Sequence, residues 1–385
     1  MVQFKRIIDL AGPAAKRSIF LFGPRQTGKT YLLRQTFPEA PTYNLLLADQ
    51  FSRLSGRPSL IREELLARKG PITGPVIIDE IQKLPLLLDE VHNLIEAHGI
   101  RFILTGSSAR KLKHGGANLL GGRAWTKHLF PLVSCEIPGF DLVRAANYGT
   151  LPAIYQSESP GEDLCAYCGT YLKEEIQAES AVRRIENFSR FLQIAALVNA
   201  ELVSFESVSR DTAIPARTIR DYFSILEDTL IGVMVRPFGR MVHRKAVSAA
   251  KFYFFDVGVC NHLAARTSIK PKTELFGKSF EHFIFTELRA WLDYTGDRRP
   301  LTFWRDYAAH EVDFIVDDEI AIEVKSTEQA VEKHLKGLRM FSEDVRVKHK
   351  IIVSMDAAPR MLGDVEVLPW KEFLTRMWAG AYAAA

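Results

Sequence analysis

A glycine-rich octapeptide near the amino terminus restricts the fold more than any other feature of the chain. It fits the pattern G-x-x-x-x-G-K-[ST] and consists of Gly23, Pro24, Arg25, Gln26, Thr27, Gly28, Lys29 and Thr30. A strand-like apolar run, Ser18–Phe22, precedes it, and a helix-like segment that begins at Tyr31 follows it. In this order of strand, loop and helix, the backbone N–H groups of the loop curl around phosphate oxygens. We therefore predict that residues 23–31 bind a nucleotide, with Lys29 on the outer phosphates and the Thr30 hydroxyl on Mg²⁺.

The chain around this loop alternates short apolar runs with helix-length amphipathic segments. We expect strands at residues 18–22, 43–46, 76–79, 102–105 and 125–130, and a helix over residues 84–97 that stops at Gly99. Such alternation is typical of crossover units and a mostly parallel sheet covered on both faces. The sequence therefore predicts an α/β fold whose first domain is a doubly wound nucleotide-binding domain over residues 1–145.

Polar side chains follow two of these expected strands. Asp79 and Glu80 end one apolar run, where a nucleotide-hydrolysing enzyme needs one carboxylate to hold Mg²⁺ and another to polarise water. We assign Asp79 to the metal and Glu80 to the base. The next strand ends at Thr105, followed by Ser107, and either hydroxyl can sit between the water and the γ-phosphate or only complete a turn.

Residues 146–250 change to helical spacing. Segments 188–200, 205–212 and 216–228 read as three helices, followed by a strand at 230–235, an order that indicates a helical lid ending in a winged helix-turn-helix. The segment from Arg210 to Lys251 contains eight basic and four acidic residues. We predict nucleic-acid contacts from the third helix and the wing, and the alternative is a solvated face or a module used only for packing. The residues concerned are Arg217, Arg220, Arg240, Arg244 and Lys245.

Residues 251–385 return to an α/β pattern with two acidic strand-like runs, Glu311–Val316 and Ile320–Lys325. A three-residue loop between them places Asp313 opposite Glu323 on one face, whereas a two-residue loop places them on opposite faces. In the first register the two carboxylates can share a Mg²⁺ while Lys325 steadies a hydroxide, which suits phosphodiester hydrolysis. The alternative is an exposed hairpin whose charges pair across the strands.

Composition limits where the chain works. No uninterrupted apolar run approaches the 18 or so residues that span a bilayer, and four cysteines are too few for a disulfide framework. We therefore expect a cytoplasmic protein without a membrane partner. The formal net charge, 50 − 46 = +4, neither demands nor excludes nucleic acid.

Taken in order, these motifs resemble those of AAA+ ATPases, with residues 23–30 as Walker A, 76–80 as Walker B and 105–108 as sensor 1. Further segments are similar to a prokaryotic group in which an AAA+ domain is joined to a C-terminal domain of unknown function with a PD-(D/E)XK nuclease-like fold. These segments are 130–132, 148–152, 222–229, 252–258 and 311–326.

The resemblance implies ATP and Mg²⁺ as cofactors and a homo-oligomeric ring. In such rings an arginine of one subunit reaches the γ-phosphate of its neighbour, and Arg123 is similar in position, although it can also be a solvated loop charge. The fold resemblance further implies that Glu281 is an acidic ligand of the second metal site.

Three functional hypotheses follow. The first is a Mg²⁺-dependent AAA+ ATPase that couples hydrolysis to DNA binding or remodelling. The second is an ATP-gated, metal-dependent DNA endonuclease. The third belongs to another class, a nucleotide-controlled switch that binds protein and cuts nothing.

Overall fold

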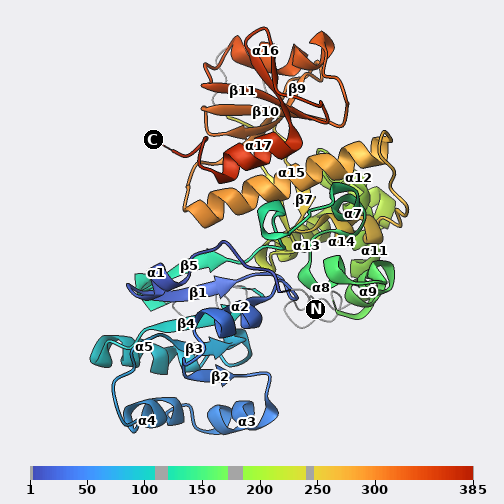
Figure 1. The fold of residues 1–385 in the computed structure, drawn as a ribbon. Coiled ribbons are helices and arrows are strands. Elements are labelled where there is room, and N and C mark those ends of the chain that lie inside the picture. Colours follow the sequence, from blue (N-terminus) through green and yellow to red (C-terminus); the bar gives the residue numbers. More distant parts are fainter. Residues whose placement is uncertain (1–2, 109–119, 172–184, 240–246, 385) are drawn as a thin grey trace.

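The computed structural model describes residues 3–108, 120–171, 185–239 and 247–384, which form an amino-terminal sheet, a helical middle and a carboxy-terminal sheet (Figure 1). The first sheet has five strands in the order β2-β3-β4-β1-β5, and every pairing in it is parallel. Its strands are β1 (Ser18–Phe22), β2 (Thr42–Asn44), β3 (Val76–Asp79), β4 (Phe102–Gly106) and β5 (Ala124–His128). The doubly wound α/β prediction for this part of the chain is therefore confirmed in its sheet.

Helices cover both faces of this sheet because successive strand residues point to opposite sides. Ile19 and Leu21 pack with α1 and α2 on one face, whereas Phe20 and Phe22 pack with α4 and α5 on the other. The helix α5 begins at Leu87 and ends at Gly99, whose φ of 65° places it in the left-handed region. The helices of this unit are α1 (Ala11–Ala14), α2 (Lys29–Thr36), α3 (Ala48–Gly56), α4 (Leu60–Leu66) and α5 (Leu87–His98), with short 3₁₀ turns at Ile81–Lys83 and Leu120–Gly122.

The middle of the chain is mainly helical. Three of its helices, α11, α12 and α13, are followed by an antiparallel two-stranded ribbon, β6 (Gly232–Val235) with β7 (Lys251–Phe254). The strand expected to open the third unit, β7, thus pairs with β6. The helical elements are Ser134–Glu136, α7 (Leu142–Tyr148), α8 (Pro152–Gln156), α9 (Pro160–Ala166), a π-helical turn Tyr167–Tyr171, α11 (Ile185–Leu197), α12 (Phe205–Thr212), α13 (Ala216–Asp228) and α14 (Val257–Leu263).

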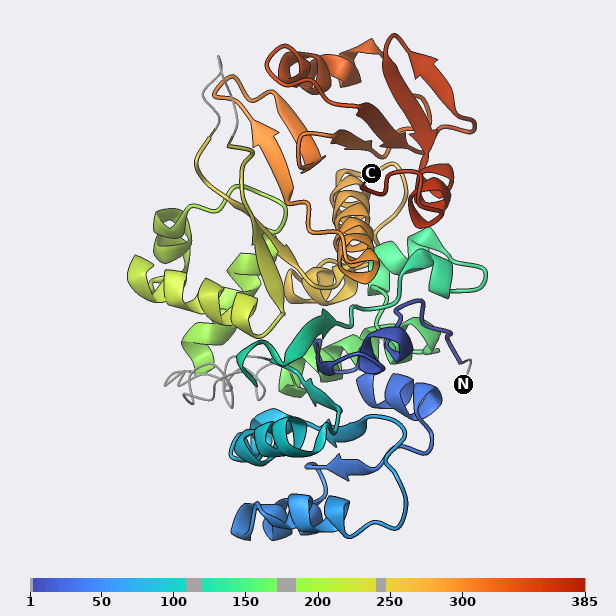
Figure 2. The same cartoon turned by 90° about the vertical axis from the view of Figure 1, so that its left-hand side faces the viewer.

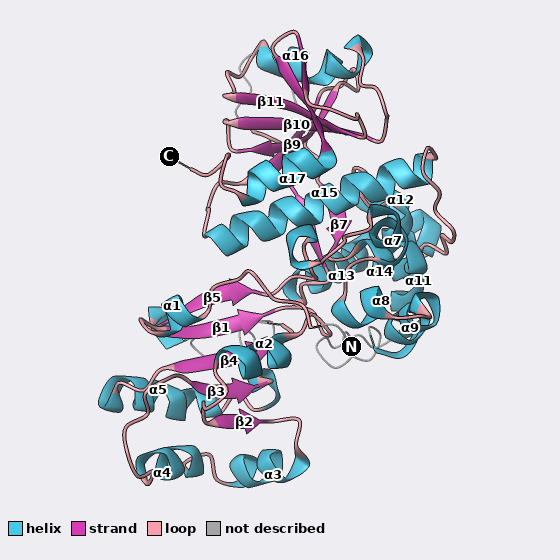
Figure 3. Cartoon of the chain, in the orientation of Figure 1, coloured by secondary structure: helices cyan, strands magenta, loops and turns pink. Residues whose placement is uncertain are grey.

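The carboxy-terminal sheet has six strands in the order β12-β13-β11-β10-β9-β8 (Figure 3). Ile320, Ala321 and Ile322 of β10 pair with Val316, Ile315 and Phe314 of β9, so a three-residue loop joins the two strands. The register predicted from a three-residue loop is therefore confirmed. The elements are α15 (Glu274–Thr295), β8 (Leu301–Arg305), β9 (Glu311–Val316), β10 (Ile320–Lys325), a 3₁₀ turn Glu332–Leu335, α16 (Lys336–Ser342), β11 (His349–Ser354), β12 (Arg360–Leu362), β13 (Val365–Pro369) and α17 (Trp370–Trp378).

The long helix α15 lies between the two sheets (Figure 2). Its aromatic side chains, among them Phe280 and Trp291, pack into the same core as strands β9 to β11. Near its carboxy-terminal end, Asp293 Oδ2 lies 2.7 Å from His128 Nδ1 at the end of β5. Glu287 accepts hydrogen bonds from the Ser134 backbone and the Trp378 indole, and burial raises the pKa of this carboxyl group to about 7. The helix therefore contacts the first sheet and the carboxy-terminal unit at the same time.

Within the described residues, no helix combines the length and the apolar character that crossing a membrane requires.

Candidate active site

The glycine-rich loop leaves the carboxyl end of β1 and enters α2 at Lys29. Gly28 has a φ of 94°, a conformation that side chains with a Cβ atom rarely adopt. Gly23 lies so close to the end of β5 that an added Cβ would meet the Leu129 carbonyl oxygen at 2.3 Å. The Lys29 ammonium group donates hydrogen bonds to the carbonyl oxygens of Gly23 at 2.6 Å and Pro24 at 3.1 Å. The loop thus closes on its own lysine at the positive end of a helix, where a phosphate binds well.

The two predicted Mg²⁺ residues meet directly beside the loop. Thr30 Oγ1 donates a hydrogen bond of 2.8 Å to Asp79 Oδ2, and the Thr105 hydroxyl donates to the other oxygen of the same carboxylate. Asp79 itself is only 2% exposed. A hydroxyl and a carboxylate next to a phosphate loop are hard oxygen donors of the kind that Mg²⁺ prefers, so these residues fit the metal.

The predicted base, Glu80, is held by two neighbours. Its backbone N–H donates to Thr105 Oγ1 at 3.0 Å, and its carboxylate accepts a hydrogen bond from the Gln82 amide. Gln82 Nε2 also donates to Ser107 Oγ at 3.2 Å. Of the two predicted sensor residues, Thr105 therefore contacts both Asp79 and Glu80, whereas Ser107 contacts Gln82. Gln82 was not predicted, because a polar residue two positions after an acidic pair is not distinctive in sequence.

A cavity of about 400 Å³ adjoins the phosphate loop. It is mostly apolar and is lined by the amino-terminal segment with Phe4, by the loop at Gln26–Gly28, by Tyr31, and by Pro152 at the start of α8. Its position beside the phosphate loop suits the base and sugar of a nucleotide, because such pockets combine apolar walls with a few polar groups. Tyr31, which we predicted to bind the nucleotide, lines this cavity.

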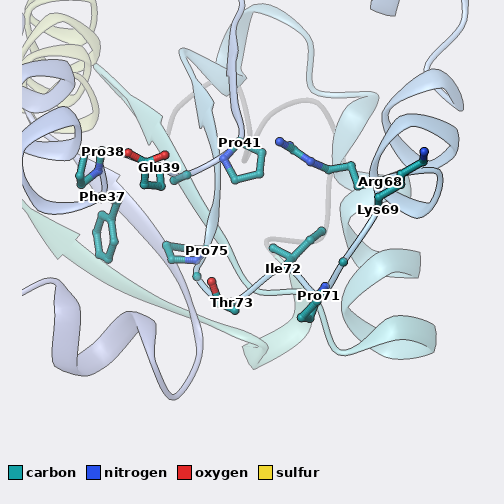
Figure 4. A pocket seen from close by; sticks show the side chains of 13 residues that line it. Phe37, Pro38, Glu39, Pro41, Arg68, Lys69, Pro71, Ile72, Thr73 and Pro75 are labelled. Atoms are coloured by element: carbon teal, nitrogen blue, oxygen red, sulfur yellow. The ribbon is translucent and has the colours of Figure 1, made fainter.

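Two further cavities lie beside β2 and β3. One of about 330 Å³ is lined by Thr30 and Asp79 and so opens onto the metal residues. The other, of about 320 Å³, is formed by residues 37–41 and 68–75, which precede β2 and β3 (Figure 4). It contains none of the predicted site residues and lies at the amino-terminal ends of the strands, whereas the phosphate loop lies at their carboxy-terminal ends.

Arg123 also lies at the amino-terminal ends of the strands. It directly precedes β5, where Ala124 pairs with Ser18, whereas the phosphate loop follows Phe22, which pairs with His128. Its guanidinium group pairs with Glu96 at the surface. Arg123 is therefore placed a full strand length from the phosphate loop of its own chain.

Comparison with known families agrees with this geometry. Residues 15–137 match the AAA domain family, and the phosphate loop and both acidic residues lie within that stretch. The protein is a P-loop ATPase. Residues 139–270 match a domain of unknown function (DUF8612), and residues 276–373 match a second one (DUF4143). The ATPase domain is thus followed by two domains of unknown function.

Among solved structures, one similar chain is a Signal Transduction ATPase with Numerous Domains (STAND) protein with a tetratricopeptide repeat sensor from Pyrococcus horikoshii. The match has 16% sequence identity and a TM-score of 0.21, and it covers 73% of this chain and 46% of that chain. The ATPase therefore spans less than half the length of this neighbour. No curated protein matches the chain.

The second acidic group of the ATPase lies where α15, β7, β9 and β10 meet. Asp313 Oδ2 accepts the Val324 N–H at 2.8 Å, and Lys325 Nζ lies 2.5 Å from Glu323 Oε1. Glu323 Oε2 is buried and accepts no hydrogen bond from any residue that the structure describes. Burial and the neighbouring Asp313 raise the pKa of Glu323 well above its ordinary value.

A buried lysine that was not predicted, Lys251, completes this group. It is 2% exposed, lies 3.3 Å from Glu281 Oε1, and also pairs with Glu311. Burial opposes its charge, but the surrounding carboxylates outweigh burial and raise the pKa of Lys251. The Tyr253 hydroxyl donates a further hydrogen bond of 2.7 Å to Glu281. In the sequence, Lys251 is only a cation at the start of an apolar strand, which does not distinguish it.

These contacts bear on the predicted second metal site. The structure brings Asp313, Glu323 and Lys325 together as expected, but it engages Glu281 with Lys251 and Tyr253. Within the described ranges, no three His, Cys, Asp or Glu side chains are arranged to hold a metal ion. Lysine ammonium groups supply the positive charge, so this group as it stands does not fit a metal.

The predicted nucleic-acid residues are only partly described. Arg217 and Arg220 are exposed on α13. Arg220 lies 3.3 Å from Glu206 and over the ring of Phe205, both on α12. Arg240, Arg244 and Lys245 lie outside the described residues.

Proposed function

We propose that the protein is a Mg²⁺-dependent AAA+ ATPase that couples ATP hydrolysis to a nucleic-acid transaction. Mg²⁺ would be held by Thr30 and Asp79, where it neutralises charge on the outer phosphates. Glu80 would orient and deprotonate the attacking water, and Lys29 would bind the phosphates.

The observation that carries the nucleic-acid part is the order of α11, α12 and α13 followed by the antiparallel ribbon of β6 and β7. This is the element order of a winged helix, in which the third helix and the wing contact the duplex. Arg217 lies exposed on that helix, and the segment between β6 and β7 contains the basic residues at 240–245. Because contacts of this kind go to phosphates, we expect little sequence preference.

DNA affinity should fall steeply as salt rises, because each neutralised phosphate releases counterions. Replacing Arg240, Arg244 and Lys245 together by alanine should reduce the slope of log affinity against log salt. The expected reduction is about one unit for each phosphate that the protein no longer neutralises. Fluorescence anisotropy with single-stranded, duplex and branched DNA at several salt concentrations measures this slope.

Lys272→Ala is the matched control, since Lys272 is an exposed cation that pairs with Glu328. It should leave the slope unchanged. Failure of the ATP-bound protein to bind any of the three DNA forms at low salt would remove the nucleic-acid proposal.

The protein-binding switch is the second candidate. It is favoured by the pairing of Arg220 with Glu206, because a carboxylate beside this arginine lowers the positive potential of the helix that would contact DNA. It is also favoured by the lysines in the acidic group, because an interior neutralised by Lys251 and Lys325 suits a binding scaffold. The ATP-gated endonuclease has less support, since the same lysines stand where a metal would have to bind.

We also propose that the ATPase assembles into a homo-oligomer in which Arg123 reaches the nucleotide of a neighbouring subunit. The ATPase rate per subunit should then rise with protein concentration, and Arg123→Ala should lower turnover by at least about 10-fold without a matching loss of nucleotide affinity. Steady-state assays over a dilution series, with mass photometry alongside, test both effects. A rate per subunit that stays constant while the oligomer dissociates would contradict the proposal. Arg53→Ala, at another exposed ion pair of the same domain, serves as control.

A further inference from the structure

The amino-terminal segment sends one arginine into the interior beside the phosphate loop. The Arg6 side chain is only 4% exposed, and its Nε lies 2.9 Å from Glu136 Oε2. Its Nη1 donates a hydrogen bond of 2.7 Å to the carbonyl oxygen of Thr27, inside the phosphate loop. Its Nη2 donates to the carbonyl oxygen of Phe130 at 2.7 Å and to the hydroxyl of Tyr294 at 3.0 Å. A single guanidinium group therefore joins the phosphate loop, the segment after β5 and helix α15.

The contact with Thr27 controls the direction of a phosphate donor. In a planar trans peptide the C=O group and the following N–H group point in opposite directions. By holding the Thr27 carbonyl, Arg6 directs the Gly28 N–H away from itself. Backbone N–H groups of such a loop are the donors that hold phosphate oxygens, and Gly28, with its φ of 94°, has little steric restraint of its own. Arg6 supplies the restraint that the glycine lacks.

The contact with Tyr294 extends this restraint to the carboxy-terminal unit. Tyr294 lies on α15, and its hydroxyl accepts hydrogen bonds from Arg6 and from the Phe130 backbone N–H at 3.1 Å. The ring of Tyr294 also packs against Phe130 with centroids 5.7 Å apart. Glu136 holds the other side of Arg6 and accepts the Ile7 N–H at 2.8 Å, so the arginine cannot swing away without breaking an ion pair. A shift of α15 would therefore change the group that orients Gly28.

We propose that Arg6 is a positioning residue for the phosphate loop. Through its contact with Arg6, Tyr294 makes nucleotide affinity depend on the position of α15 relative to that loop. The proposal concerns ATP binding and does not depend on the nucleic-acid function. Coupling of this kind is reciprocal, so bound nucleotide should in turn stabilise the contacts of α15.

Tyr294→Phe tests the link with a minimal change, because it keeps the ring and removes only the hydroxyl. It should weaken ADP binding by about 5-fold, the value of one or two hydrogen bonds, while kcat at saturating ATP stays within about 2-fold. Arg6→Ala should weaken ADP binding by about 10-fold or more, since charged hydrogen bonds are stronger. Titration with a fluorescent ADP analogue gives the affinity, and ATP turnover gives KM and kcat.

The controls separate positioning from general destabilisation. Arg17→Ala removes another arginine that donates to a carbonyl oxygen. Its acceptor is Gly122, at the end of the strands away from the phosphate loop, so ADP affinity should stay unchanged. Partial unfolding would lower the number of binding sites rather than the affinity of those that remain. Arg6→Lys should recover part of the affinity, because lysine can still donate to one carbonyl.

The double variant decides whether the two residues act as one. Since Tyr294 acts through Arg6, adding Tyr294→Phe to Arg6→Ala should cost less than about 2-fold beyond Arg6→Ala alone. Full additivity, or unchanged ADP affinity in Tyr294→Phe, would overturn the link to α15. Unchanged affinity in Arg6→Ala would overturn the positioning role.

Discussion

Lys29→Ala is expected to raise the dissociation constant for ATP by about 1,000-fold, because it removes at least two charge-assisted hydrogen bonds to phosphate. The ammonium group now donates to the carbonyl oxygens of Gly23 and Pro24, and a bound phosphate would accept the same donors. Calorimetric titration with ATP and Mg²⁺ measures the loss.

Lys16→Ala is the control for Lys29→Ala, since Lys16 is an exposed lysine that precedes β1 at the other end of the same strand. The Lys16→Ala variant should bind ATP with the same affinity as the unaltered protein. If Lys29→Ala bound ATP nearly as well as that control, the phosphates would bind elsewhere, and the assignment of the loop would fail.

Glu80→Gln should lower the rate of ATP hydrolysis by about 1,000-fold, the value of a general base. Nucleotide binding should remain, because glutamine has the same shape and its carbonyl oxygen can still accept the Gln82 amide that now donates to Glu80. Asp79, Thr30 and Lys29 also keep their places in this variant. A single-turnover assay with prebound ATP separates the chemical step from binding.

The matched control is Glu39→Gln, which changes an exposed carboxylate of the same domain at the cavity shown in Figure 4. It should hydrolyse ATP at the normal rate. Normal turnover in Glu80→Gln would instead move the base to another residue.

Much of the ATPase site follows from local sequence. Gly28 is required by the backbone conformation of the loop itself, and Asp79 and Glu80 are placed by the end of one strand, whereas the close approach of Gly23 to Leu129 depends on the packing of β5. The register of β9 with β10 was also predictable, because a loop of three residues sets the register of a hairpin.

Other features depend on contacts across the chain and could not be predicted. Arg6 contacts Tyr294, 288 residues away, and Lys251 of the ribbon in the middle unit contacts Glu311 at the start of β9 in the carboxy-terminal sheet. No periodicity or spacing encodes such meetings, because they depend on how the three parts of the chain pack. The strand β12 was missed for a different reason, because a segment of only three residues offers little pattern to detect.

Helix α15 has a mechanical consequence. Its 22 residues make a rod about 33 Å long, with Tyr294 near one end and the Glu281 and Lys251 contact toward the other. A tilt of about 5° about the Tyr294 end would displace the far end by about 3 Å, at the standard rise of an α-helix. Glu281 lies about 20 Å from Tyr294 along the helix, so the same tilt would displace it by about 1.7 Å, roughly half of the 3.3 Å that separates Lys251 Nζ from Glu281 Oε1. A tilt of α15 would therefore change the contact between Lys251 and Glu281, which lies far from the phosphate loop.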